Sequence, residues 1–174
     1  MKARTATALA EIQLLILDVD GVLTDGRLYF GPRGEALKVF DVRDGYGLSA
    51  LRRAGVEIAV ISGRRSPAVA ARCRELKVRH VHQGVSDKLA VFERLRVRLE
   101  LAPEACACVG DDLPDVPLMN AVALPFAVAD AHPAVRRAAA VVTRQGGGRG
   151  AVREVCDLLL ANRTRERRRR GGSR

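Results

Sequence analysis

Two aspartates at the end of an apolar run are the residues in this chain best placed to do chemistry. The segment "LLILDVDGVLTDG" (14–26) places Asp18 and Asp20 directly after Leu-Leu-Ile-Leu. A buried strand has no reason to carry such residues unless they emerge where solvent, a metal or a substrate can meet them. A carboxylate presented there can attack an electrophile, and a second one beside it can exchange a proton. We expect Asp25 to orient the following loop instead of reacting.

Polar groups also follow two later apolar runs. These polar groups are Ser62-Gly63-Arg64 and Gly110-Asp111-Asp112. In a parallel sheet, ligands gather at the carboxyl ends of the strands, so these groups should meet Asp18 at one edge. Asp18 and Asp111, with Asp115 as a third candidate, would form an oxygen-rich pocket that requires a hard cation such as Mg²⁺.

Magnesium best prepares a phosphoryl group for attack by a carboxylate. Lys88, Ser62 and backbone amides after Asp18 would then hold the phosphoryl oxygens. Each element has a plainer explanation: Asp-x-Asp can be a turn or a cap, Ser62-Gly63 a simple turn, and Lys88 a solvated lysine. Their conjunction on successive strand ends favours catalysis.

The elements that must position these residues alternate along the chain. Short apolar runs occur in six segments, "IQLLILD", "VEIAVIS", "VRHVHQ", "ACACVGDD", "VALPFAVAD" and "AAAVVT". Between them lie stretches with the 3.6-residue period of helices. We expect Ser66-Pro67 to begin one of these helices and Ser86 to begin another. The pattern predicts an α/β protein, a Rossmann-like three-layer fold with a mostly parallel sheet. At about 27–42, two β-rich runs joined by Gly-Pro-Arg-Gly predict a β-hairpin inserted after the first strand.

Length and composition predict one domain of 174 residues, nearly half of them hydrophobic. We expect a flexible segment at 1–10, the folded domain at 11–160 and a basic, disordered tail at 161–174. The tail holds seven arginines and so carries most of the net charge of +10. No signal peptide or membrane span is visible, and the four scattered cysteines fit reduced thiols, so we expect a cytoplasmic protein.

Four segments together, "DVDGVLTDG", "ISGR", "DK" and "GDDLPD", resemble the motifs of the haloacid dehalogenase superfamily of phosphatases. The resemblance implies that Asp18 is the nucleophile that forms an aspartyl-phosphate and that Asp20 is the general acid and base. It implies that Ser62 and Lys88 bind the phosphoryl group. Magnesium would be held by Asp18, by the backbone carbonyl of Asp20 and by Asp111, with Asp112 and Asp115 further out.

Neither interval between these motifs is long enough for the cap domain that most members of the superfamily carry. Such a capless chain, over about 14–160, resembles the family of 3-deoxy-D-manno-octulosonate 8-phosphate (KDO 8-phosphate) phosphatases of lipopolysaccharide synthesis. The resemblance implies a homotetramer in which hairpins form a central barrel and a neighbouring subunit replaces the cap. The residues it implies in substrate binding, besides Asp20 and Lys88, are Asp41, Val42, Arg43, Asp44, Gly45, Arg64 and Arg72.

Two alternatives stay open. Related capless phosphatases act on nine-carbon sugar acid phosphates, which the sequence does not separate from the eight-carbon acid. From another class, the chain could be an inactive scaffold whose basic tail binds nucleic acid or an anionic surface. The scaffold hypothesis predicts the loss of at least one reacting residue, yet Asp18, Asp20, Lys88 and Asp111 are all present.

Overall fold

The centre of the fold is a sheet of six parallel strands, seen in a computed structural model that describes residues 9–171 and their side chains as far as 164. The strand order is β5-β4-β1-β6-β7-β8. The strands are β1 (Leu14–Leu17), β4 (Glu57–Ser62), β5 (His80–Gln83), β6 (Cys106–Gly110), β7 (Leu124–Ala127) and β8 (Val141–Val142). Each lies within one of the six predicted apolar runs. In the middle of the sheet, Leu17 of β1 is in register with Val60 of β4 and Val109 of β6.

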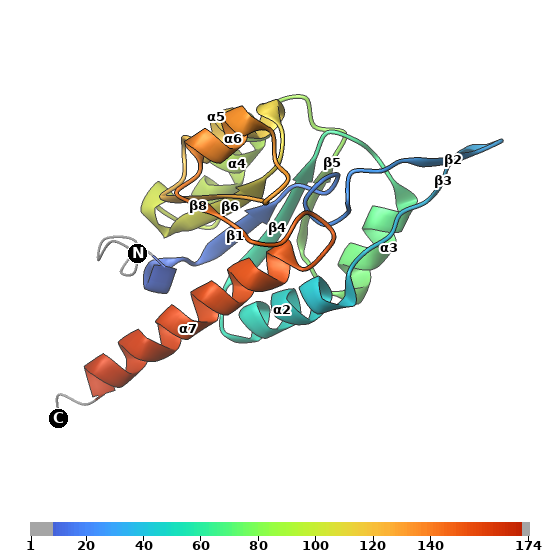
Figure 1. The fold of residues 1–174 in the computed structure, drawn as a ribbon. Coiled ribbons are helices and arrows are strands. Elements are labelled where there is room, and N and C mark those ends of the chain that lie inside the picture. Colours follow the sequence, from blue (N-terminus) through green and yellow to red (C-terminus); the bar gives the residue numbers. More distant parts are fainter. Residues whose placement is uncertain (1–8, 172–174) are drawn as a thin grey trace.

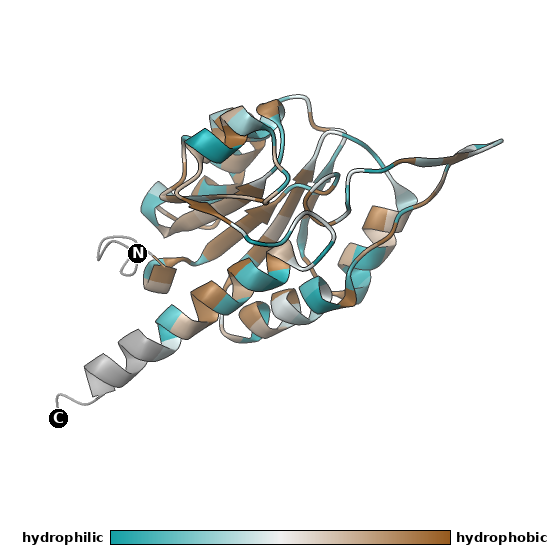
Figure 2. Ribbon diagram, viewed as in Figure 1, coloured by the Kyte–Doolittle hydropathy of each residue, from teal (hydrophilic) through white to brown (hydrophobic). Residues whose placement is uncertain are grey.

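Helices cover both faces of the sheet, as the alternating pattern predicts (Figure 1). One face carries α2 (Val42–Arg53), α3 (Pro67–Glu75) and α7 (Ala151–Gly171), and the other carries α4 (Lys88–Arg98), α5 (Val116–Met119) and α6 (Pro133–Ala138). Short 3-10 turns, η1 (Pro103–Ala105) and η2 (Leu113–Asp115), flank β6. The sheet between the helical layers is strongly apolar (Figure 2), because its central strands are covered on both faces and bury their side chains. The three-layer α/β fold is confirmed.

The predicted hairpin is also confirmed, as β2 (Tyr29–Gly31) paired antiparallel with β3 (Gly34–Leu37). It forms a separate two-stranded sheet and projects from the body of the molecule (Figure 1). Gly34 has a φ of 101°, which glycine adopts without strain. Phe30 is 64% exposed although it is apolar, so the hairpin presents hydrophobic surface to the outside.

One of the two predicted helix starts is confirmed, and the other lies one residue further along the chain. Ser66 is the N-cap of α3, with Pro67 after it, but its hydroxyl donates to Glu35 of the hairpin instead of capping the helix. For α4, the prediction of Ser86 was wrong. Asp87 is the N-cap, and its carboxylate accepts a hydrogen bond of 2.9 Å from the amide of Ala90. A carboxylate at this position satisfies a free amide and interacts favourably with the helix dipole.

The folded part reaches beyond both predicted boundaries. Leu9, expected in the flexible segment, is completely buried. At the other end, α7 continues through the basic segment to Gly171, since arginine favours the helix. Arg163 donates to the carbonyls of Ile12 at 2.8 Å and Ala54 at 3.2 Å, which ties this helix to the domain. The expected ends at 1–8 and 172–174 lie outside the described residues. Among the described helices, none is long and apolar enough to cross a membrane.

Candidate active site

Asp18 and Lys88 form the centre of the site. Asp18 follows β1 directly, and its backbone amide still donates to Val109 of β6, which fixes the carboxylate at the strand end. Lys88 is the first residue of α4, and its Nζ lies 2.9 Å from Asp18 Oδ1 and 2.6 Å from Asp115 Oδ1. Burial acts to lower the pKa of Lys88, but Asp18 and Asp115 outweigh it and raise that pKa above its usual value. The lysine is therefore a fixed positive charge.

Three carboxylates cluster here, and two of them contact the Lys88 ammonium. Asp18, Asp111 and Asp115 offer oxygens that all lie within 4.8 Å of one another. Burial, together with Asp115 and against the opposing effect of Lys88, raises the pKa of Asp18 to about 6. Burial and the charges of Asp18 and Asp115 raise the pKa of Asp111 to about 8. The cluster thus holds more negative charge than its surroundings stabilise.

The donor set fits a hard divalent cation. Among the described residues, Asp111 Oδ1 is buried and has no hydrogen-bond partner, whereas both oxygens of Asp115 are engaged. Asp115 Oδ1 accepts from Lys88, and Oδ2 accepts from the amides of Asp111 at 3.0 Å and Asp112 at 3.4 Å. A side chain at Gly21 would overlap the Asp111 carboxylate, so glycine there lets the two strand-end loops approach. Asp18 and Asp111 are left as the available carboxylate ligands.

Asp20 lies beside the cluster and has partners of its own. Its Oδ1 accepts a hydrogen bond from Lys38, a residue that the sequence analysis did not select, and its Oδ2 lies 3.7 Å from Arg64 Nε. Lys38 follows β3 of the hairpin. The only sequence signal for it is a lysine directly after a β-rich run, which by itself is typical of a solvated strand end. The contact depends on the path of the hairpin.

These groups line one open pocket of about 360 Å³ at the carboxyl edge of the sheet. Ser62, the last residue of β4, is buried at its wall. The pocket is lined by Asp18, Asp20, Gly26, Ser62, Gly63, Arg64, Lys88, Asp111, Asp112, Pro114 and Asp115. The structure therefore brings together every catalytic and metal-binding residue that the sequence analysis selected, and Arg64 with them.

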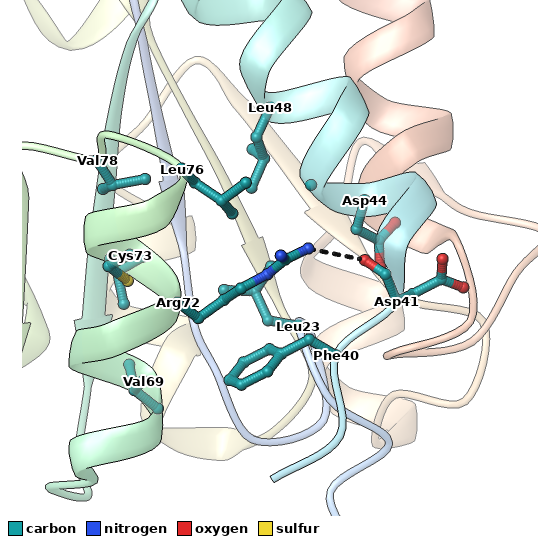
Figure 3. Close-up of a pocket in the computed structure, with 12 residues that line it drawn as sticks. Leu23, Phe40, Asp41, Asp44, Leu48, Val69, Arg72, Cys73, Leu76 and Val78 are labelled. Carbon is teal, nitrogen blue, oxygen red and sulfur yellow. Dashed lines mark hydrogen bonds between the residues drawn. The ribbon is translucent and has the colours of Figure 1, made fainter.

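The other predicted substrate residues lie elsewhere in the single chain. Figure 3 shows Arg72 of α3 pointing between α2 and α3, among Leu48, Leu76 and Phe40. Its Nη2 is 3.5 Å from the carbonyl of Asp41, and its Nη1 pairs with Glu75 at 2.9 Å. Neither Arg72 nor the segment 41–45 lines the pocket of Asp18.

The segment 41–45 has clear structural tasks at the start of α2. Asp41 is the N-cap, and its carboxylate pairs with Arg43 at 2.6 Å. Val42 is exposed, and Gly45 leaves room for the Arg72 guanidinium. Asp44 is buried, and its Oδ1 accepts a hydrogen bond of 2.7 Å from the amide of Arg153 in the first turn of α7. Substrate binding by these residues stays a prediction.

The α/β fold and the paired carboxylates Asp18 and Asp20 are typical of haloacid dehalogenase-like hydrolases, and comparisons with known proteins agree with this class. Residues 74–153 match the family of haloacid dehalogenase-like hydrolases. The chain is 56% identical over 149 residues to the KDO 8-phosphate phosphatase of Escherichia coli K12, covering 86% of this chain and 79% of that protein.

Solved structures show the same relationship. The KDO 8-phosphate phosphatase of Yersinia pestis superposes with a TM-score of 0.92 at 48% identity, covering 94% of this chain and 89% of the other. The enzyme of Moraxella catarrhalis, solved with magnesium, phosphate and KDO, gives 0.91 at 36% identity over 94% of both chains. The chain belongs to the KDO 8-phosphate phosphatase family of the haloacid dehalogenase superfamily, a family of phosphoric monoester hydrolases.

Proposed function

We propose that this protein hydrolyses KDO 8-phosphate to KDO and inorganic phosphate, in the synthesis of lipopolysaccharide precursors. The observation that carries the proposal is the position of Asp18, which directly follows β1, lies 2.9 Å from Lys88 and offers an oxygen within 4.8 Å of one from Asp111. The magnesium, phosphate and KDO bound by the Moraxella relative support the substrate and the cofactor. Asp18, Asp111 and the backbone carbonyl of Asp20 would hold Mg²⁺, which supplies charge neutralisation between carboxylate and phosphate.

In the first step, a carboxylate oxygen of Asp18 attacks phosphorus, and the bond between phosphorus and the sugar oxygen breaks. Lys88 keeps Asp18 ionised and oriented, and its positive charge stabilises the oxygens of the phosphoryl group. Asp20 donates a proton to the departing sugar oxygen. In the second step, Asp20 takes a proton from water, which attacks the aspartyl-phosphate and releases phosphate while restoring Asp18.

Specificity for an acidic sugar requires positive charge at the mouth of the pocket. Arg64 lines the pocket and, unlike the buried Lys88, is 43% exposed, so it can meet the carboxylate or hydroxyls of a substrate. Arg72 and the segment 41–45 would contribute only through contact with a neighbouring subunit. The proposal therefore includes a homotetramer in which an adjacent chain covers the open pocket.

The exposed apolar side chains of the hairpin support such an assembly. Leu28, Tyr29, Phe30 and Leu37 are each at least 40% exposed. Hydrophobic surface on a projecting hairpin is typical of an interface between copies. All four cysteines are free and buried, which fits a reducing compartment, so we place the reaction in the cytoplasm.

The experiment that tests the substrate is a panel of phosphate esters with Mg²⁺. KDO 8-phosphate, a nine-carbon sugar acid phosphate and hexose phosphates would be compared by kcat/KM. The proposal predicts at least a tenfold preference for KDO 8-phosphate. A preference for the nine-carbon acid would instead select the alternative phosphatase. The scaffold alternative predicts no turnover of any ester.

A further inference from the structure

Each of the two reacting carboxylates has a buried lysine of its own. Lys88 contacts Asp18, and Lys38 donates to Asp20. The side chain of Lys38 is 1% exposed, less than the 7% of Lys88, although it follows a hairpin that projects into solvent. Burying an ammonium without a compensating partner is costly, so a lysine in this position indicates a fixed electrostatic contact.

A second hairpin residue, Glu35, completes the arrangement. Its Oε2 lies 3.3 Å from Lys38 Nζ and accepts from Arg64 Nη2 at 3.4 Å, and its Oε1 accepts from the Ser66 hydroxyl. Glu35 thereby joins the hairpin to the start of α3 and holds both cations that flank Asp20. The contact also explains why Ser66 does not cap its helix with its side chain.

The geometry leaves one oxygen of Asp20 for the reaction. Oδ1 accepts from Lys38, whereas within residues 9–171 the contact of Oδ2 is with Arg64 at 3.7 Å, and Asp20 lines the open pocket. A carboxyl group fixed through one oxygen presents the other in a single orientation. Proton transfer requires this, because a general acid acts only within hydrogen-bond reach of the atom it protonates.

We propose that Lys38, held by Glu35, is a positioning residue that aims Oδ2 of Asp20 at the leaving oxygen of the substrate. The inference rests on the proposed function and extends the active site into the hairpin of the same chain. As Asp18 bonds to phosphorus and the ester bond to the sugar breaks, the proton on Asp20 Oδ2 passes to the sugar oxygen. Lys38 takes no part in bond making.

The test compares two esters that differ in their need for an acid. An alkyl phosphate such as KDO 8-phosphate requires protonation of its leaving oxygen, whereas p-nitrophenyl phosphate leaves as a stable phenolate. The ratio kcat/KM reports the steps up to loss of the leaving group. For Lys38→Met we expect kcat/KM for the sugar phosphate to fall by about 10²-fold, within the range of general acid catalysis. We expect less than about a threefold fall with p-nitrophenyl phosphate.

Lys77→Met is the matched control, because Lys77 is exposed on the turn after α3; it should leave both ratios unchanged. Glu35→Gln should give the same selective loss to a smaller degree, and combining it with Lys38→Met should add little, since both act through one contact. Lys38→Arg should restore part of the sugar phosphate activity. If Lys38→Met folds poorly, Glu35→Gln and Lys38→Arg still test the proposal.

Equal losses with both esters in the folded Lys38→Met and Glu35→Gln variants would overturn the positioning role, as would no loss with either. These results leave the proposed function standing, because the wild-type protein still turns over KDO 8-phosphate. A wild-type protein that turns over neither ester would overturn the function and this inference together.

Discussion

The ammonium of Lys88 lies 2.9 Å from the carboxylate of Asp18, although 70 residues separate them in the chain, and the same ammonium contacts Asp115. Lys88 begins α4 and Asp18 directly follows β1, so the contact joins a helix start to the centre of the sheet. Asp18 and Asp115 belong to the cluster of three carboxylates, whereas the other cations of the site, Arg64 and Lys38, lie against Asp20.

Replacing Lys88 with methionine should therefore lower both the activity and the stability of the protein. We expect kcat to fall by about 10²-fold to 10³-fold, as for the loss of one preorganised electrostatic group. The free energy of unfolding should fall by about 3 kcal/mol, because buried carboxylates lose their partner. Steady-state kinetics and urea unfolding measure the two effects. Arg94→Met, at an exposed position of the same helix, is the control and should change neither.

Asp111 should govern the response to metal. In the wild type, Mg²⁺ should raise Tm, because it neutralises the clustered carboxylates. Asp111→Asn should abolish most of this rise while leaving the metal-free protein at least as stable as the wild type. Thermal unfolding with EDTA and with Mg²⁺ measures both. Asp157→Asn, at an exposed position of α7 outside this pocket, is the matched control. An undiminished Mg²⁺ shift in Asp111→Asn would exclude Asp111 as a ligand.

Asp44 should make stability depend on pH. Its burial, opposed by the Arg153 amide, raises the pKa from 3.8 to about 6. The folded state therefore holds this proton more tightly than the unfolded chain does. The resulting stabilisation is complete below pH 4 and is lost as the pH rises through about 6, by up to about 3 kcal/mol.

Asp44→Asn keeps an acceptor for Arg153 and cannot ionise. The free energy of unfolding of the wild type minus that of the variant should thus fall between pH 4 and pH 8. Urea titrations at several pH values measure this difference. A difference that stays level, or rises with pH, would show that Asp44 ionises normally in the folded protein.

The hairpin should control assembly. Phe30 is 64% exposed and Val97 on α4 is 65% exposed, so aspartate at either position is tolerated equally well by an isolated chain. If hairpins join the subunits, Phe30→Asp should give monomers with weakened activity, whereas Val97→Asp should keep the wild-type mass in light scattering. A Phe30→Asp protein of unchanged mass would exclude the hairpin as the interface.

The residues that meet at the carboxyl edge of the sheet could be predicted from sequence, because the topology of the sheet determines which residues lie there. Parallel strands carry the residues that follow them to one edge, so Asp18, Ser62 and Asp111 had to meet once the alternating pattern was recognised. Lys88 was found through its place in a motif. Its pairing with both Asp18 and Asp115 needed the structure.

Contacts that depend on the path of a loop could not be predicted in this way. Lys38 reaches Asp20, and Glu35 reaches Arg64 and Ser66, only because the hairpin returns across the start of α3. Strand periodicity does not encode that direction. Arg72 is on the helix after the second motif, yet the register of α3 turns it toward α2 and away from the pocket. The end of the domain was placed too early because composition alone does not reveal the hydrogen bonds of Arg163.

Locating the phosphoryl group during turnover shows directly whether Asp18 is the nucleophile. Wild-type protein with Mg²⁺ would be mixed with KDO 8-phosphate carrying a radioactive phosphoryl group, quenched in acid within milliseconds and digested. We expect label on the peptide that contains Asp18, and no labelled protein with Asp18→Asn, whose turnover should also be abolished while the fold stays intact. Label on another residue, or wild-type activity in Asp18→Asn, would contradict this role of Asp18.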